Sequence, residues 1–207
     1  MSYPNGQVIW DYLQSFIGND YGVAGLMGNL YAESGLLPFR LQGDYDSEHD
    51  YPASHEYSAD VNDGTISEYT FVHDSKGYGL AQWTTSGRKQ GLYTLCLGGT
   101  YYGIDSLQKQ LEYIEDELTG SYIGVLNVLQ NATSILSASN KVLFDYESPE
   151  DQSLPVQLTR WSYSRDIYNT YSGQPPIPPT PPFPPRRSKM KLYFYTLKQA
   201  RYKKGLL

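Results

Sequence analysis

The segment YGVAGLMGNLYAES, Tyr21–Ser34, decides the fold of this chain. Its glycines recur at every third position, at Gly22, Gly25 and Gly28. A glycine inside a helix costs about 1 kcal/mol relative to alanine, so this spacing predicts close approach by the backbone of another element. Asp20 is the predicted N-cap of the helix, and Gly35 follows at the position of a left-handed C-cap. We therefore expect one closely surrounded helix that ends near Ser34.

Glu33 stands near the end of this helix and on its apolar face. It follows Leu30 by three residues and Leu26 by seven, spacings that share one side of a helix. Burial and the negative end of the helix dipole both disfavour a charged carboxylate, so both are expected to raise the pKa of Glu33. A carboxyl group that keeps its proton near neutral pH can protonate the leaving oxygen of a glycoside. The alternative is that Glu33 is solvated at the helix edge or paired with an arginine such as Arg40.

The segment GYGLAQWT, Gly77–Thr84, carries a second set of candidate residues. The two glycines around Tyr78 allow the backbone to pass close to another element. Gln82 offers an amide with both donor and acceptor atoms, and Trp83 offers a large flat ring. An amide beside a ring suits a polyhydroxylated ligand, so the segment is a candidate for binding substrate.

Helical periodicity covers most of the chain outside one segment. Apolar residues recur at helical spacing in residues 7–18, 86–97, 106–118, 122–131 and 134–147, and again from Leu154. Asp105 is the predicted N-cap of the helix at residues 106–118. By contrast, residues 36–75 are polar and acidic, so we expect a long irregular lobe there, with a short strand within residues 66–74. The predicted fold class is α+β, mainly α.

The charge divides the chain into three parts. Residues 1–173 hold all 22 acidic and eight of the 16 basic residues, so this predicted domain carries a net charge of −14. Residues 174–187 contain eight prolines and are expected to form an extended polyproline linker, with an SH3-type ligand as the alternative. Residues 188–207 carry only basic and aromatic signals. Three interpretations are open: a segment that lies in a membrane–water interface, an anchor that binds an anionic surface, or the beginning of a further structural unit.

Several classes of function are disfavoured by composition. A body at −14 lacks the concentrated cations that nucleic-acid binding needs. The single cysteine, Cys96, and the histidines His49, His55 and His73 show no metal-ligand spacing, so we expect no metal and no other cofactor. No apolar stretch reaches 18 residues, and the N-terminus lacks a basic region followed by an apolar run. We therefore expect neither a transmembrane segment nor a signal peptide.

Taken in order, the motifs resemble a known family. Glu33-Ser34 followed by Pro38, and then the Gly77–Trp83 segment, are similar to the lysozyme-like superfamily that includes lytic transglycosylases. The likeness is strongest to the phage tail lysozymes, because residues 25–38, 77–89, 110–118 and 145–153 all look like motifs of that family. The resemblance covers residues 7–172. It implies a lysozyme-like domain with the irregular lobe after the catalytic helix, and cleavage of the β-1,4 glycan of peptidoglycan.

The resemblance also implies roles for individual residues. It makes Glu33 the general acid of a muramidase and places Gln82 and the backbone of residues 77–79 along the cleft. Tyr78 and Trp83, in the same segment, are further candidates for binding substrate. Tyr146 and Glu147 match an aromatic-Glu-x-Pro element of the family, which either holds the fold or touches sugar.

The second catalytic group is not fixed by the resemblance. The candidates are Asp44, Asp46 and Asp74, with Asp46 slightly favoured. A lytic transglycosylase of the same fold needs no second carboxylate, because the 6-hydroxyl of the sugar attacks. A non-catalytic module that only binds glycan is the remaining alternative.

The expected partner is bacterial peptidoglycan. The C-terminal segment is a candidate for contacts with phage tail proteins or with another injection machine. The expected location is a phage tail tip, or otherwise the extracellular space and cell wall.

Overall fold

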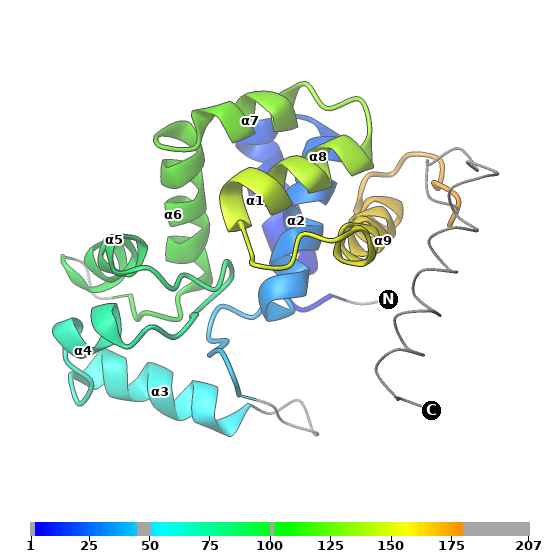
Figure 1. Ribbon diagram of the computed structural model, residues 1–207. Helices are drawn as coiled ribbons and strands as arrows, with labels where there is room; N and C mark the ends of the chain where they lie inside the picture. Colours follow the sequence, from blue (N-terminus) through cyan, green and yellow to red (C-terminus); the bar gives the residue numbers. More distant parts are fainter. Residues whose placement is uncertain (1–2, 45–50, 100–101, 180–207) are drawn as a thin grey trace, which may run out of the picture.

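Helix α2, Asp20–Ser34, runs through the centre of the computed structural model, which describes residues 3–44, 51–99 and 102–179 (Figure 1). Four helices pack directly around it: α1 (Gly6–Ile17), α7 (Ile123–Gln130), α8 (Ile135–Val142) and α9 (Leu154–Tyr171). Helix α6, Leu107–Thr119, joins this bundle through α1 and α7. The apolar side chains of α2, including Leu26 and Leu30, are fully buried as a result.

The glycines of α2 explain how so many helices fit around it. A β-carbon at Gly22 would lie 2.2 Å from the carbonyl oxygen of Leu129 on α7. At Gly25 it would lie 2.5 Å from Cβ of Ala138 on α8, and at Gly28 2.1 Å from Oγ of Ser164 on α9. Each glycine therefore accommodates a different neighbouring helix. The predicted close approach is confirmed at all three positions.

The ends of α2 agree with the sequence at one terminus only. Gly35 adopts φ +65° and donates its N–H to the carbonyl of Tyr31 at 2.9 Å, which confirms the predicted C-cap. The N-cap is Asn19 and not Asp20: the Oδ1 of Asn19 accepts hydrogen bonds from the N–H groups of Tyr21 and Gly22. Asn19 has the extended backbone that a cap requires, whereas the next residue is already helical. In the same way, Ser106 and not Asp105 caps α6.

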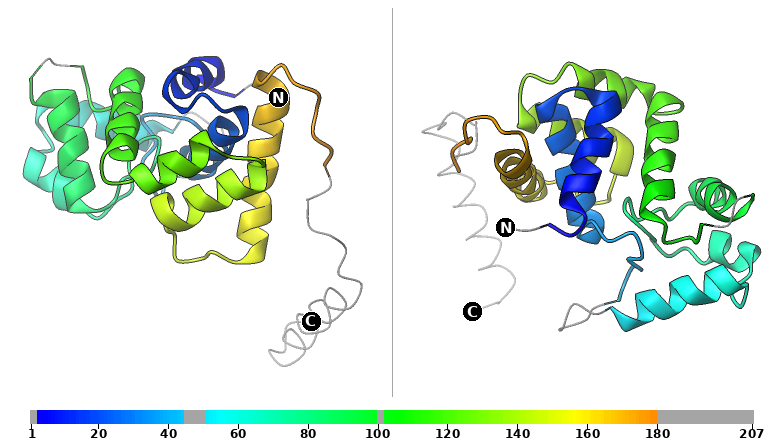
Figure 2. Two further views of the ribbon diagram at one scale, coloured as in Figure 1. Left: turned by 90° about the horizontal axis from the view of Figure 1, so that it is seen from above. Right: turned by 180° about the vertical axis from the view of Figure 1, so that it is seen from behind.

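The expected irregular lobe is mainly helical, so this prediction was wrong in part. Residues 36–75 contain α3 (Pro52–Asp63) and α4 (Glu68–His73). After the Gly77–Thr84 segment, α5 (Ser86–Leu97) confirms the helix predicted at residues 86–97 and completes the lobe. The expected strand within residues 66–74 is replaced by α4, whose N-cap Ser67 accepts a hydrogen bond from the N–H of Thr70. Figure 2 shows that α3, α4 and α5 lie together on one side of the bundle. The few apolar residues of these helices are enough to pack them against the rest of the protein, because Tyr57 and Val61 on α3 and Phe71 on α4 are all buried.

The β component reduces to two isolated bridges in the part of the chain that the structure describes. Leu41 pairs with Tyr78, and Tyr78 pairs with Trp83, both in antiparallel fashion. These bridges tie the chain after α2 to the Gly77–Thr84 segment. The fold is therefore mainly helical. A short π-helix, η1 (Leu143–Glu147), follows α8 directly.

The start of the proline-rich segment is attached to the domain. Asn169 on α9 donates its Nδ2 to the carbonyl of Ile177 at 3.1 Å and accepts the N–H of Ile177 at 2.7 Å. The side chain of Ile177 packs against the core. The first residues of the predicted linker thus lie on the domain surface, while its remainder and the whole 188–207 segment lie outside the described residues.

Candidate active site

A cleft of about 550 Å³ opens where the lobe meets the helical bundle. Its lining comes from four segments, within residues 32–33, 40–43, 81–88 and 147–149. Glu33 enters it from the end of α2, Gln82 from the loop before α5, and Glu147 from η1. Three residues singled out from the sequence therefore line one cleft, although they are far apart in the chain.

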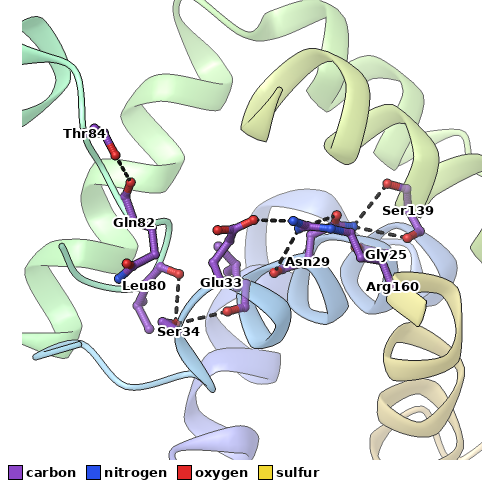
Figure 3. A network of polar contacts seen from close by, with 10 residues as sticks. Gly25, Asn29, Glu33, Ser34, Leu80, Gln82, Thr84, Ser139 and Arg160 are labelled. Atoms are coloured by element: carbon purple, nitrogen blue, oxygen red, sulfur yellow. Dashed lines mark hydrogen bonds and ion pairs between the residues drawn. The ribbon is translucent and has the colours of Figure 1, made fainter. Parts of the chain in front are cut away.

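Glu33 forms an ion pair with Arg160, which reaches it from α9 (Figure 3). The Nη1 of Arg160 donates to Oδ1 of Asn29 at 3.1 Å, and the Nδ2 of Asn29 donates to the carbonyls of Gly25 and Ser139. The Glu33 side chain is 20% exposed and that of Arg160 is 9% exposed. The Glu33 carboxylate therefore remains accessible from the cleft, while the hydrogen bond to Asn29 fixes the guanidinium of Arg160. The partner of Glu33 is thus an arginine, but Arg160 and not Arg40.

Glu147 presents a carboxyl group without a matching cation. Its Oε1 is buried and has no hydrogen-bond partner among the residues that the structure describes. Burial raises the pKa of Glu147 well above its usual value, and the negative charge of Glu33 raises it further. Arg88 and Arg160 oppose this shift without cancelling it. Glu147 is therefore the carboxyl in this cleft that burial and charge favour in its protonated form.

Arg88 lines the cleft and is fixed by a buried carboxylate beneath it. It donates to both oxygens of Glu117, from Nε at 2.6 Å and from Nη2 at 2.8 Å. The same Glu117 accepts the indole N–H of Trp83 at 2.9 Å and the hydroxyl of Tyr146 at 2.7 Å. One carboxylate on α6 thus joins the Gly77–Thr84 segment, α5 and η1, which together form one wall of the cleft.

The three aromatic residues predicted to bind substrate lie in the core. Tyr78, Trp83 and Tyr146 are all buried, and none of them lines the cleft. Tyr78 shares a hydrogen bond of 2.5 Å with the hydroxyl of Ser58 on α3. In this structure, the rings of these residues support the cleft from behind.

Gln82 does reach the cleft, from a strained backbone position. It adopts φ +46°, which is uncommon for a residue other than glycine. Its Nε2 donates to the carbonyls of Arg40 at 2.9 Å and of Gly79 at 3.1 Å. The amide therefore braces the two loops that form this part of the cleft, and such strain is commonly kept at functional sites.

The aspartates considered as second catalytic groups are placed differently. Asp74 ends α4, pairs with Lys89 at 2.5 Å and accepts a hydrogen bond from Tyr57, outside the cleft lining. Asp44 accepts hydrogen bonds from the N–H and hydroxyl of Ser54, at 2.8 and 2.6 Å. Asp46 lies outside the described residues. Of the acids considered from the sequence, the structure brings Glu147 to the cleft of Glu33.

Arg160 was missed from the sequence. Its only local signal is a charged residue beside Trp161 on the buried side of α9. Its pairing with Glu33 depends on the contact between Gly28 and Ser164, which places Arg160, one turn before Ser164, near the end of α2. That register between two helices distant in the chain cannot be read from either segment alone.

Within residues 3–44, 51–99 and 102–179, no group of three or more Cys, His, Asp or Glu side chains could hold a metal ion. Across the same residues, none of the helices combines the length and the apolar character that crossing a membrane demands.

The model of the phage tail lysozyme family matches residues 4–171. The chain belongs to this family. The match begins before α1 and ends with α9, so it takes in every residue of the cleft lining. It confirms the resemblance that the spaced motifs indicate. No curated protein and no solved structure matched the chain.

Proposed function

We propose that this phage tail lysozyme is a muramidase that cleaves the β-1,4 linkage between MurNAc and GlcNAc in peptidoglycan. The observation that carries the proposal is the position of Glu33, a carboxylate at the end of a central helix that faces a cleft and is oriented by Arg160. Membership of the family supports a role in peptidoglycan hydrolysis.

The chemistry of the cleft supports a sugar polymer as substrate. Its lining includes the guanidinium groups of Arg40 and Arg88, the amide of Gln82 and the hydroxyls of Thr84 and Thr85. The Nη1 of Arg40 is buried and has no hydrogen-bond partner among the described residues, so it offers a donor to a bound ligand. Clefts that bind glycans present such groups, because each sugar ring brings several hydroxyls that need partners.

A lytic transglycosylase of the same fold is the second candidate. It needs only one catalytic carboxyl, since the 6-hydroxyl of the substrate replaces water. The presence of Glu147 in the cleft favours hydrolysis, because two carboxyl groups are the usual equipment of a hydrolysing glycosidase. A module that binds glycan without cleaving it is the third possibility.

The proposed setting is a virion tail that penetrates the cell wall locally. The family name supports this setting, and the +8 charge of residues 174–207 suits an anionic partner such as a tail protein or a wall polymer. We propose the C-terminal segment as the attachment to that partner.

Digestion of purified Gram-positive sacculi with mass analysis of the products tests the proposal. Wild type is expected to release fragments with reducing MurNAc ends, and Glu33→Gln is expected to release none above background. Glu56→Gln is the matched control, because Glu56 is exposed on α3 and away from the cleft. Fragments that end in 1,6-anhydro-MurNAc would identify a transglycosylase. Binding to sacculi without release of fragments would identify a binding module.

A further inference from the structure

We infer that Arg40 binds a carboxylate of the substrate, carried by the lactyl and peptide branch of MurNAc, and so makes the cleft prefer peptidoglycan to neutral β-1,4 glycans. This inference rests on the proposed function and deepens it, because it names the group of the substrate that one cleft residue recognises. It is carried by the missing carboxylate partner of Arg40, by the contacts that fix its guanidinium, and by the pairing of the other charges in the cleft.

Arg40 lines the cleft without an acidic partner. Within residues 3–44, 51–99 and 102–179 it forms no ion pair, and its buried Nη1 has no hydrogen-bond partner there. A buried charged donor that lacks a partner costs free energy, and an anionic ligand would recover that cost. The side chain is therefore incomplete without a ligand.

The carboxyl groups of the cleft are matched to other cations. Among the described residues, two carboxyls line the cleft, those of Glu33 and Glu147. Glu33 pairs with Arg160, and the cations that oppose the raised pKa of Glu147 are Arg88 and Arg160. Neither acid is paired with Arg40, so its positive charge remains available to a group of the substrate.

The guanidinium of Arg40 is positioned by an aromatic ring. Its Cζ lies over the ring of Tyr51, 3.9 Å from the ring centroid. Such a contact covers one face of the guanidinium and leaves the N–H groups at its edge able to donate. Tyr51 adopts φ +48°, which is uncommon for a bulky residue, and its carbonyl accepts the N–H of Ser54 at 3.0 Å. Backbone strain of this kind is commonly retained at functional sites.

The backbone of Arg40 is fixed as well. Its carbonyl accepts the N–H of Gly79 and the Nε2 of Gln82, each at 2.9 Å. Gln82 lies on the other side of Glu33 from Arg160 (Figure 3). A glycan bound at Glu33 therefore meets a fixed cationic group in the same cleft, in addition to the arginine that pairs with Glu33.

The chemistry of a guanidinium favours a carboxylate as its ligand. Its parallel N–H groups match the two oxygens of a carboxylate in geometry and in charge. The sugar hydroxyls and N-acetyl groups of peptidoglycan are neutral. Its carboxylates lie on the branch at O3 of MurNAc, either on the stem peptide or on the lactyl group from which the peptide has been removed. The group that Arg40 recognises is a carboxylate on this branch.

Neutralising the substrate tests the inference in the unaltered enzyme. Soluble, uncross-linked peptidoglycan strands freed of teichoic acid would be cleaved before and after carbodiimide coupling of ammonia, which converts carboxylates into amides. The kcat/KM of wild type is expected to be about 10–100-fold lower on the amidated strands, the range that loss of a charge-assisted hydrogen bond predicts. Equal kcat/KM on both substrates would overturn the inference and leave the proposed function intact.

Strands stripped of their peptides distinguish the two sources of the carboxylate. Intact strands carry the carboxylates of the stem peptide, whereas strands treated with an amidase that removes the peptide carry only that of the lactyl group. The source is the substrate that wild type cleaves faster than the amidated form of the same substrate. If neither substrate shows such a preference, the inference is wrong.

Variants of Arg40 link the preference to this side chain. Arg40→Gln is expected to lose about 10–100-fold on native strands and nothing further on amidated ones, and Arg40→Lys should lie between it and wild type. Arg165→Gln is the matched control, because Arg165 also lies over an aromatic ring, that of Trp161, but is paired with Asp166 outside the cleft lining. It is expected to keep the preference of wild type. A preference of wild-type size in Arg40→Gln would refute the role of Arg40.

Binding measurements separate failure of this inference from failure of the proposed function. Calorimetry would compare the Kd for native and amidated strands in Glu33→Gln, which is expected not to cleave them. Native strands are expected to bind about tenfold or more tightly, and adding Arg40→Gln should abolish the difference. This result, with no fragments released by wild type, would refute the muramidase and retain the carboxylate site. Cleavage by wild type with equal binding of both substrates would do the reverse.

Discussion

A β-carbon on Gly28 of α2 would lie 2.6 Å from Cα of Ser164 on α9, so the two helices touch backbone to backbone at this pair. One helical turn before Ser164, Arg160 reaches Glu33 at the end of α2. The closeness of the two backbones therefore fixes both the core and the position of the candidate catalytic carboxylate.

Gly28→Ala is expected to lower the free energy of unfolding by about 1–3 kcal/mol, because backbone atoms of Ser164 must move to admit the methyl group. Glycan cleavage is expected to fall as well, since α9 carries Arg160 away from Glu33. Urea denaturation and sacculus digestion measure the two effects. Gly87→Ala is the control, because a β-carbon there meets nothing within 4 Å. An equal free energy of unfolding for Gly28→Ala and wild type would contradict the prediction, because it would mean that α2 and α9 can move apart without loss of stability.

Arg160→Met is expected to destabilise the protein by about 3 kcal/mol, because it leaves the half-buried Glu33 and the buried Asn29 without their shared donor. The double variant with Glu33→Gln is expected to be less destabilised than the sum of the single variants. A double-mutant cycle in urea measures this coupling. Additive effects would mean that the ion pair contributes nothing to stability.

Tyr146→Phe tests whether Tyr146 supports the fold and does not bind sugar. Loss of its hydrogen bond to the Glu117 carboxylate is expected to lower the free energy of unfolding by about 2 kcal/mol. The KM for glycan is expected to stay unchanged, because the ring is buried. The control Tyr69→Phe alters an exposed tyrosine and is expected to change neither quantity. A raised KM with unchanged stability would place Tyr146 in contact with substrate.

Asp74→Asn tests one of the two described candidates for a second catalytic acid that do not line the cleft, the other being Asp44. It leaves the fully buried Lys89 without a carboxylate, and burial already lowers the pKa of that lysine. We expect a loss of about 3 kcal/mol in stability. Adding Lys89→Met should recover part of it. Activity per folded molecule is expected to persist in the double variant, and its complete loss would instead make Asp74 part of the catalytic machinery.

Stability should depend on pH through Glu147. Because its pKa is raised in the folded state, the folded protein holds a proton that the unfolded chain has released. The resulting stability is fully present below the unfolded value of 4.5 and is lost as pH rises toward the folded pKa. Over that range, wild type should lose up to about 1.4 kcal/mol per pH unit relative to Glu147→Gln. Urea denaturation of both proteins from acidic to neutral pH checks the difference, and parallel curves would contradict it.

The helices of the bundle could be predicted because their apolar residues repeat. Leu111, Ile114 and Leu118 on α6 are all buried, as their spacing indicates. Helix α3 has no such repeat: only Tyr57 and Val61 supply large buried apolar side chains, and both depend on partners elsewhere in the chain. Polar composition therefore indicated an irregular segment where tertiary packing stabilises a helix.

The site could be predicted where a residue stands at a recognisable position, as Glu33 does at a helix end. The aromatic candidates show the limit, because a tryptophan such as Trp83 has the same sequence signal in a core as in a groove. Its burial is decided by Glu117, which no local pattern connects to it. Glu147 could be located from its motif, but its environment comes from four different helices.

The two hydrogen bonds between Asn169 and Ile177 also have a mechanical consequence. Tension on the chain beyond residue 177 is transmitted first to Asn169, and so to helix α9. Arg160 lies nine residues earlier on that helix, about 14 Å along its axis. Force applied to the C-terminal end therefore acts on α9, the helix whose Arg160 orients Glu33. The strength of the two hydrogen bonds between Asn169 and Ile177 sets the largest force that reaches α9 by this route before they break.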